Sequence, residues 1–297
     1  MVLIRTLTLA AALSLAFAGA ALAAPAKTKA KARPAAAAKA APAAPAAGST
    51  ESAPKGENAD ALRRAAQNPV ANMISLPFQT NTNFNYGRYK QDQNVLNFQP
   101  VIPFKINDDW NLITRWITPL VYQPQLTPNG QREFGLGNLT PSFFLSPAHS
   151  GEVIWGAGPI LYLPTATDKT LGTNKWGGGP SFVALTIQGP WVVGALVNNI
   201  WAGTQNSRVN LFTLQPFINY NLPHGWYLTS GPVITANWLT KNGEKWTVPV
   251  GGGIGRLFRL EKLPINAQVQ AFYNVVKPTD GANWTLRFQV QALLPAH

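Results

Sequence analysis

The sequence predicts an all-β protein: a transmembrane antiparallel up-and-down β-barrel of about 12 strands, preceded by a disordered N-terminal segment. Three observations support this fold class. Residues 69–297 alternate apolar and polar side chains, Trp and Tyr gather at the ends of the alternating runs, and short and long connections follow one another in turn. A period of two is typical of β-strands, and aromatic residues at both ends of an apolar face are typical of strands that cross a bilayer.

The first 23 residues have the pattern of a secretory signal peptide. Arg5 supplies the positive charge, Leu7 to Phe17 form the apolar core, and Ala21-Leu22-Ala23 is a small-residue cleavage site. The apolar core is too short for a helix that spans a membrane. We therefore expect residues 1–23 to be cleaved during export, and the mature protein to reach the outer membrane.

Residues 24–58 differ in composition from the rest of the chain. They consist almost entirely of Ala, Pro, Lys, Gly and Ser and contain no aromatic residue. Such a segment buries too little apolar surface to offset the entropy of ordering it, so we predict a disordered linker. Its lysines could contact anionic lipid or polysaccharide, but a solvated linker is the favoured interpretation. Residues 59–69 are predicted to form a short helix that ends at Pro69, and residues 70–297 the barrel.

The strand prediction is clearest in three stretches, which read MISLPFQTNTNFNYG (73–87), VLNFQPVIPFKI (95–106) and WTLRFQVQALL (284–294). In the last of these, Leu286, Phe288 and Val290 alternate with polar residues, so we expect them to face lipid. A soluble barrel or sandwich would bury the apolar face instead. The polar faces are rich in Asn, Gln and Thr, which suit a watery lumen and would be costly in a closed core.

The connections between the predicted strands fall into two interleaved sets. Five are short, at residues 107–109, 147–152, 188–190, 223–225 and 261–264. Six are longer or more polar, at residues 87–94, 123–133, 165–175, 203–208, 240–245 and 277–283. Strict alternation of the two sets predicts twelve strands with both termini on the short-turn side. Short turns face the periplasm and longer loops face the exterior in outer-membrane barrels.

Several other function classes find little support. Residues 163–181 carry Lys and Gly like a phosphate-binding loop, but they join two strands, whereas that loop needs a helix after it. The chain has no Cys, and half of its net charge of +12 lies in residues 1–68, so neither thiolate metal sites nor a basic nucleic-acid surface is predicted. The three histidines, His149, His224 and His297, lie in turns or at the terminus and face no Ser. We expect no enzyme activity, cofactor, metal or nucleic acid.

The candidate site is the lumen of the barrel. All five charged residues within predicted strands are basic, and three of them, Lys105, Arg115 and Arg287, have the parity of the polar face. Arg256 and Arg259 lie on opposite faces of the same predicted strand, so at least one of them is expected to reach only the interface. The predicted pore-lining residues are Lys105, Arg115, Arg287, Gln99, Gln289, Gln291, Asn81 and Asn83. An open lumen with these charges would favour anions, while an alternative role is hydrogen bonding that stiffens the barrel.

The sequence also resembles a known family over nearly all of residues 68–294. The matching blocks are NPVANMISLPFQ, NFQPVIPFKINDDWNLITRWITPLVYQP, GPILYLPTATDKTLGTNKWGGGPS, GPWVVGALVNNIW and LQPFINY. They are similar to Gram-negative outer-membrane proteins labelled for the MetA pathway of phenol degradation, whose members are often called transporters or neuromedin U. The resemblance implies an outer-membrane barrel linked to uptake of hydrophobic or aromatic compounds, but it supplies no binding residues.

Two functions remain open at this point. The first is a porin-like channel or transporter for small solutes, and the second is a non-conducting structural or binding barrel, plugged by side chains or by residues 59–69. Twelve strands lie between the small barrels that side chains fill and the wide barrels that hold an aqueous channel. The partners expected in either case are outer-membrane lipids and the barrel-assembly machinery, with a small-molecule solute for the channel.

Overall fold

The computed structural model describes residues 62–204, 207–240 and 243–295 of the 297-residue chain. The predicted signal peptide (1–23) and linker (24–58), and the first residues of the predicted helix, lie outside the described residues.

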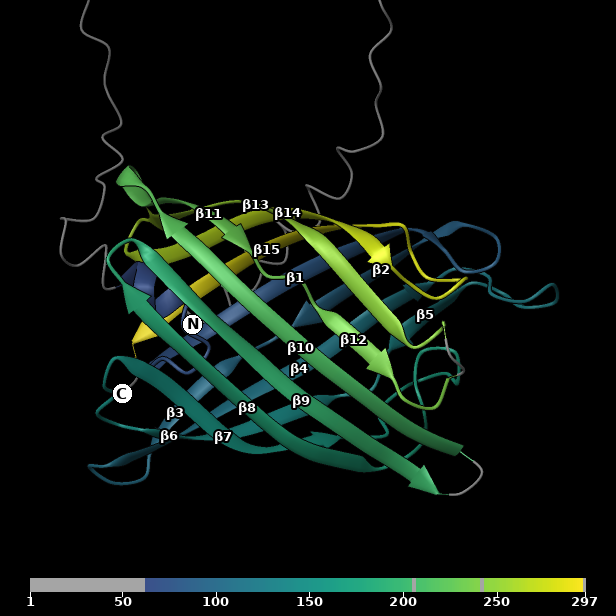
Figure 1. Cartoon of the computed structure of the whole chain (residues 1–297), viewed down its shortest axis with the longest axis horizontal. Helices are drawn as coiled ribbons and strands as arrows, with labels where there is room; N and C mark the ends of the chain where they lie inside the picture. Colours follow the sequence, from purple (N-terminus) through teal and green to yellow (C-terminus); the bar gives the residue numbers. More distant parts are fainter. Residues whose placement is uncertain (1–61, 205–206, 241–242, 296–297) are drawn as a thin grey trace, which may run out of the picture.

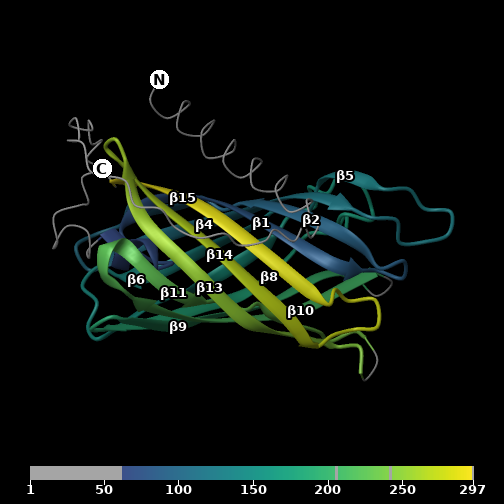
Figure 2. The same cartoon turned by 90° about the horizontal axis from the view of Figure 1, so that it is seen from above.

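The described residues form a closed 12-strand antiparallel β-barrel, which confirms the predicted fold class. Its single sheet closes because β1 pairs with β15 along almost the whole of both strands (Figures 1 and 2). The strands are β1 (Met73–Tyr86), β2 (Gln91–Phe98), β3 (Val101–Lys105), β4 (Trp110–Gln123), β5 (Glu133–Leu136), β6 (Thr140–Pro147), β7 (Val153–Tyr162), β8 (Gly177–Gln188), β9 (Trp191–Thr204), β10 (Ser207–Asn221), β11 (Trp226–Ser230), β12 (Ile234–Asn237), β13 (Trp246–Leu260), β14 (Leu263–Val276) and β15 (Trp284–Pro295).

Three of the twelve positions around the barrel are each filled by two shorter strands. β2 and β3 both pair with β1 and β4, β5 and β6 both pair with β4, and β11 and β12 both pair with β10 and β13. Pro100 lies in the first gap and Pro232 in the last. Proline has no amide hydrogen to give to a neighbouring strand, which accounts for the interruption at both places.

The two ends of the barrel differ in their connections. One end, the short-turn end, carries five connections at residues 106–109, 148–152, 189–190, 222–225 and 261–262. The opposite, long-loop end carries the connections after β1, β4, β7, β9, β12 and β14. Two predicted loops are shorter than expected: β2 already begins at Gln91, and β9 continues to Thr204 while β10 begins at Ser207. The order of short and long connections otherwise follows the sequence pattern.

A short helix lies at the short-turn end, before the first strand. Residues 62–66 are helical, and the segment that follows reaches β1 at Met73. Nη1 of Arg63 donates a hydrogen bond to the carbonyl oxygen of Leu222, 2.9 Å away, and Gln67 exchanges two amide hydrogen bonds with Asn221. These contacts attach the helix to the end of β10. Within the described residues, no helix has both the length and the apolar character needed to cross a membrane.

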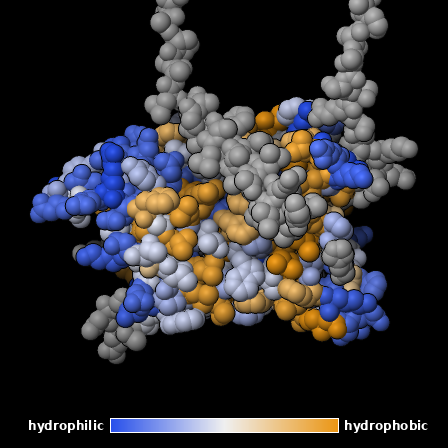
Figure 3. Space-filling view, turned by 180° about the vertical axis from the view of Figure 1, so that it is seen from behind, coloured by the Kyte–Doolittle hydropathy of each residue, from blue (hydrophilic) through white to orange (hydrophobic). Residues whose placement is uncertain are grey.

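The outer face of the barrel is apolar. Four large apolar side chains on long strands are at least one-third exposed: Leu286 and Trp284 of β15, Val269 of β14 and Val193 of β9. Figure 3 shows hydrophobic residues across the middle of one face, with hydrophilic residues gathered at its two ends. The core therefore does not lie between two sheets. The larger buried cluster lies inside the barrel instead, and a smaller one around Val290 and Ala292 lies on the outer face of β15.

Aromatic rings mark both ends of this apolar belt. Trp191 packs against Tyr220 at the short-turn end, with ring centroids 4.6 Å apart and the ring planes tilted. At the long-loop end, Trp238 packs against Trp246 at 5.5 Å, and Tyr273 packs against Trp284 at 5.0 Å. This is the arrangement of aromatic girdles around a lipid-facing band.

Candidate functional site

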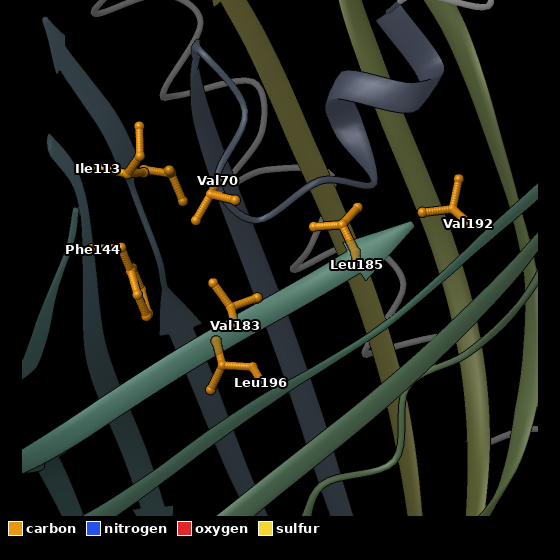
Figure 4. Close-up of a cluster of buried hydrophobic side chains, with 8 residues drawn as sticks. Val70, Ile113, Phe144, Val183, Leu185, Val192 and Leu196 are labelled. Atoms are coloured by element: carbon orange, nitrogen blue, oxygen red, sulfur yellow. The ribbon is translucent and has the colours of Figure 1, made fainter. Parts of the chain in front are cut away.

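One side of the barrel interior is filled by apolar side chains. This apolar wall consists of eight buried residues from the N-terminal segment and from β3, β4, β6, β8 and β9: Val70, Val101, Ile113, Phe144, Val183, Leu185, Val192 and Leu196. Figure 4 shows Val70 entering from the segment before β1 and pointing between the strands. Phe144 and Val183 have no exposed surface at all. This part of the interior is a packed core and leaves no room for a solute.

The opposite side is lined mainly by amide side chains. This amide wall is formed by β1, β14 and β15 and consists of Gln79, Asn266, Gln268, Gln270, Gln289 and Gln291. Its members are tied to one another and to β11: the Tyr227 hydroxyl donates to Asn266 Oδ1 at 2.7 Å, and Gln270 Nε2 donates to the hydroxyl oxygen of Thr229 at 3.1 Å. The wall is therefore ordered although it is polar.

Glycines of β13 make the bonds between β14 and β11 possible. Gly253 pairs with Gln270 on one side and with Thr229 on the other, and Gly255 lies beneath the Tyr227 ring. A Cβ atom at Gly255 would overlap that ring. Because β13 presents no side chains at these two positions, β14 and β11 can bond across it.

Between the two walls lies a cavity of about 160 Å³, here called the inner cavity. Residues 66–69 form its floor at the short-turn end. Leu196 and Phe217 bring apolar surface to it, and the amide wall brings polar surface. The cavity is therefore amphipathic, and its volume is close to that of an apolar cavity of about 150 Å³ that holds one benzene molecule.

Arg287 projects from β15 into this cavity and is held by several neutral partners. Its Nε donates to Asn81 Oδ1 at 3.0 Å, and its Nη1 donates to the carbonyl oxygen of Gly231 at 2.7 Å and to Gln270 Oε1 at 3.5 Å. The guanidinium also lies over the ring of Phe272, 4.9 Å from its centroid. Asn81 and Gln270 are the register partners of Arg287 on β1 and β14, so the strand pairing itself places this cluster.

The carbonyl group of Gly231 explains why a long hydrogen-bond donor lies at this height in the barrel. Residues 231–233 interrupt the wall between β11 and β12, and the carbonyl group of Gly231 has left the strand ladder. A backbone carbonyl without a partner is costly in a poorly solvated interior. Arg287 provides that partner from the neighbouring side of the barrel.

Arg115 of β4 is the second guanidinium of the inner cavity. Its Nη2 donates to Gln99 Oε1 at 2.6 Å, and this is its single hydrogen bond within the described part of the chain. Arg115 and Arg287 both line the inner cavity, so two like charges share one confined space. No described Asp or Glu lines the inner cavity, and neither arginine forms an ion pair with another described residue.

A second, larger space continues from the inner cavity toward the long-loop end. This outer cavity has a volume of about 590 Å³ and is lined by polar residues such as Asn81, Asn83 and Thr285, together with Phe272. Gln79 and Arg287 line both cavities. The two spaces therefore follow one another inside the barrel, and Arg287 lies where they meet.

The residues predicted to line a pore are placed as follows. Arg115, Arg287, Gln99, Gln289 and Gln291 line the inner cavity, and Arg287 and the two asparagines Asn81 and Asn83 line the outer cavity.

Lys105 lies apart from both cavities. It has the inward parity of Val101 and Pro103, but it is the last residue of β3, and its side chain is 68% exposed and paired with Asp108 at 2.6 Å. Parity alone places this charge inside the lumen. Because β3 ends at Lys105, the side chain lies instead at the mouth of the barrel.

Arg256 lies on the outer side of the barrel. Its guanidinium is 5.2 Å from the centroid of the Trp226 ring, its register partner on β11, and Trp226 is 40% exposed. Such a position near the short-turn end suits a long cationic side chain that reaches the interface.

Several lining residues were not among those predicted from the sequence. Gln268 and Gln270 alternate with Val269 and Ala271 along β14, so the same period of two identified in β15 would have found them. Val70, by contrast, precedes the first strand, and no local pattern marks it as part of the interior.

The two described histidines lie away from both cavities. His149 is in the turn after β6, and His224 is in the turn before β11. Across the described ranges, no three His, Cys, Asp or Glu side chains converge in a way that could hold a metal ion.

Two loop carboxylates are held by hydrogen bonds at the long-loop end. Glu244 accepts hydrogen bonds from the amide and the hydroxyl of Thr279, and Asp168 accepts them from Thr170. In each case the bonds to the carboxylate hold its pKa below the usual value. The first pair joins the loop after β12 to the loop after β14.

Comparison with known proteins identifies the fold. No family model and no curated protein matches the sequence. Among solved structures, the COG4313 outer membrane channel from Pseudomonas putida F1 has a TM-score of 0.55 and 18% identity, with 75% of this chain and 94% of that chain covered. At this identity the likeness concerns the fold alone.

Two other barrels are more distant. The CymD monoaromatic hydrocarbon channel has a TM-score of 0.42 and 9% identity, over 82% of this chain and 93% of its own. Outer membrane phospholipase A from Escherichia coli has a TM-score of 0.40 and 15% identity, over 76% and 93%. Scores this low carry no functional argument.

Proposed function

We propose that the protein is a channel or transporter of the outer membrane that passes small solutes. The observation that carries this proposal is the continuity of the two cavities, which share Gln79 and Arg287 and extend from the long-loop end to the segment 66–69. Side chains would fill the interior of a barrel whose role was purely structural. Here they fill one side of it.

The dimensions of the apolar belt support insertion in a membrane. Trp191 and Trp201 lie near the two ends of β9, ten residues apart. Ten residues of strand cover about 33 Å, which at a tilt of about 40° corresponds to about 25 Å along the membrane normal. This is the height of the lipid-facing band in outer-membrane barrels. The predicted signal peptide agrees with export to that membrane.

For the solute we propose small hydrophobic or aromatic compounds. The family that the sequence resembles is labelled for phenol degradation, and Leu196 and Phe217 give the inner cavity an apolar side. Its volume of about 160 Å³ suits a body of one ring. We propose no enzymatic role, because the two described histidines, His149 and His224, lie in turns away from both cavities.

A non-conducting barrel is the second candidate, and one observation favours it. Residues 62–70 occupy the short-turn end: Arg63 and Gln67 bond to the end of β10, and Val70 is 5% exposed within the apolar wall. A segment fixed in this way could close the barrel permanently, or it could move aside to let a solute through.

Two deletions behind an intact signal peptide distinguish these functions. The protein lacking residues 24–58 should still migrate as a heat-modifiable barrel in the outer-membrane fraction and should conduct like the full chain in planar bilayers, since the linker is predicted to be dispensable. The protein lacking residues 24–69 should show a larger single-channel conductance, because the floor of the inner cavity is gone. If neither protein conducts, the non-conducting barrel is the correct function, and if the shorter deletion prevents insertion, the linker prediction is wrong.

A further inference from the structure

We infer that the inner cavity binds a small organic anion, a carboxylate carried on a body of one ring or a short aliphatic chain. This inference rests on the proposed function and names the solute class of the same site. It starts from the two arginines, which supply two positive charges to a cavity that no described acidic residue lines.

No described acidic residue compensates the charges of Arg115 and Arg287. Every hydrogen-bond acceptor that they use is a neutral oxygen, from Gln99, Asn81, Gln270 or the backbone of Gly231. Two like charges in a confined interior repel each other, and each also loses hydration. A bound anion would relieve both costs, whereas a neutral ligand would relieve neither.

The arginines also retain donors for such a ligand. Nη2 of Arg287 takes no part in its three hydrogen bonds, and Arg115 uses one of its five N–H groups. Carboxylates match the planar fork of a guanidinium, and charge-assisted pairs of this kind are about twice as strong as neutral hydrogen bonds. The neutral contacts fix the orientation of both side chains before the ligand arrives.

The rest of the cavity sets the size and character of the ligand's body. Leu196, Phe217 and Val101 provide an apolar side, and the floor at residues 66–69 limits the length. Inorganic phosphate would match the charges but leave the apolar side in contact with water. A solute with an apolar body and one carboxylate satisfies both sides.

The position of Arg287 suggests the order of contact. A solute that enters through the outer cavity meets Arg287 first, because this residue lines both cavities, whereas Arg115 lines the inner one alone. The two arginines would thus act in succession on an anion that moves inward.

The test measures equilibrium binding of benzoate to the full-length protein in a nonionic detergent, with benzamide, benzylamine and inorganic phosphate as comparisons. Benzoate should bind at least about tenfold more tightly than its neutral isostere benzamide, since a charge-assisted bidentate pair replaces neutral hydrogen bonds. Phosphate and benzylamine should bind more weakly than benzoate. Equal binding of benzoate and benzamide would overturn the role of charge, and phosphate binding as tight as benzoate would overturn the role of the apolar body.

Substitutions assign the effect to the arginines. Arg115→Gln is the primary variant because it disturbs a single hydrogen bond, and it should weaken benzoate binding about tenfold or more while leaving benzamide binding unchanged. Arg287→Gln should act in the same direction. Arg208→Gln, an exposed arginine on β10 that lines neither cavity, is the matched control. Heat-modifiable migration verifies that each variant folds.

Binding in detergent does not depend on transport, so the site and the channel can fail separately. A protein that conducts in bilayers but does not distinguish benzoate from benzamide retains the proposed function and loses this site. A protein that binds benzoate through the arginines but does not conduct, even without residues 24–69, retains the site and loses the channel. Unchanged benzoate binding in both arginine variants refutes the assignment to Arg115 and Arg287.

Discussion

The apolar wall and the amide wall face each other across the same barrel, yet they have opposite properties. On the apolar wall, Phe144 and Val183 are fully buried. Val70, from the segment before β1, packs with them inside the barrel. Gln270 of the amide wall and its register partner Arg287 are almost as deeply buried, but they border on open space and are held by hydrogen bonds. Burial therefore has two causes in this interior: close packing on one side and hydrogen-bonded order on the other.

The difference indicates a division of labour within one sheet. Close packing stabilises a structure but leaves no space for a ligand, whereas a polar network around a cavity keeps space open at the cost of desolvated groups. Substitutions in the apolar wall should therefore change stability, and substitutions in the amide wall should change what the barrel binds and conducts.

The largest effect is expected for Phe144→Ala in the apolar wall. Removal of this fully buried ring should lower the free energy of unfolding by about 3–5 kcal/mol, because the strands around it cannot close the gap. Urea unfolding of the protein in lipid vesicles measures the change. The control is Leu145→Ala, the next residue, whose side chain is 40% exposed on the outer face and where lipid fills the space. Equal losses for the two variants would mean that the apolar wall is not a packed core.

The second-largest loss of stability is expected on the outer face of β15, one of the strands of the amide wall. Phe288 of β15 packs with Val290 and Ala292 in an apolar cluster, on the face opposite to Arg287. Phe288→Arg should destabilise the barrel by about 2–4 kcal/mol if this face meets lipid near the midplane. Asn97→Arg, which places the same charge in the outer cavity, should cost less than about 1 kcal/mol because water reaches it. Similar costs for both would contradict the assignment of the two faces.

A smaller, functional effect is expected for Arg115→Gln. The native channel should prefer anions, and the variant should have an anion-to-cation permeability ratio closer to one, because a charge that lines the path is lost. Reversal potentials in a salt gradient measure this ratio. Lys105→Gln is the control: its side chain is 68% exposed at the mouth and already paired with Asp108, so selectivity should hardly change. A native preference for cations would refute the prediction.

These walls differ in how far the sequence predicts them. β15 alternates without interruption, so parity alone sets Arg287 apart from Leu286, and the twelve-strand fold follows from such runs and their connections. β8 reads SFVALTI, with apolar residues on both faces, and periodicity cannot tell the interior from the lipid side there. Periodicity therefore could not predict the apolar wall.

Two further features depend on contacts that are remote in sequence. Val70 becomes part of the interior because the segment before β1 folds under the barrel, which no local pattern encodes. The orientation of Arg287 in the inner cavity depends on its hydrogen bond to the carbonyl of Gly231, 56 residues away in the chain. Alternation predicts which face a side chain takes, but not where a strand ends or what packs across the lumen.

The smallest effect is expected at the long-loop end of the barrel, where hydrogen bonds to a carboxylate join two loops. Glu244 accepts two hydrogen bonds from Thr279 and so joins the loop after β12 to the loop between β14 and β15. These bonds lower the pKa of Glu244 in the folded protein. Because the folded pKa lies below the unfolded one, the contribution to stability is present above the unfolded pKa and is lost as the pH falls through the folded pKa. Acidification through the lowered pKa of Glu244 should therefore release the contact between the two loops, and the Thr279 amide should then exchange faster with solvent. Hydrogen exchange at neutral and acidic pH measures this change in protection, corrected for the intrinsic pH dependence of exchange.

Glu244→Gln should already show faster exchange at neutral pH and little further change in protection on acidification. The amide of Thr170, held by Asp168, is the control and should behave alike in both proteins. If Thr279 remained equally protected in the native protein and in Glu244→Gln at neutral pH, the two loops would be joined by something other than this carboxylate.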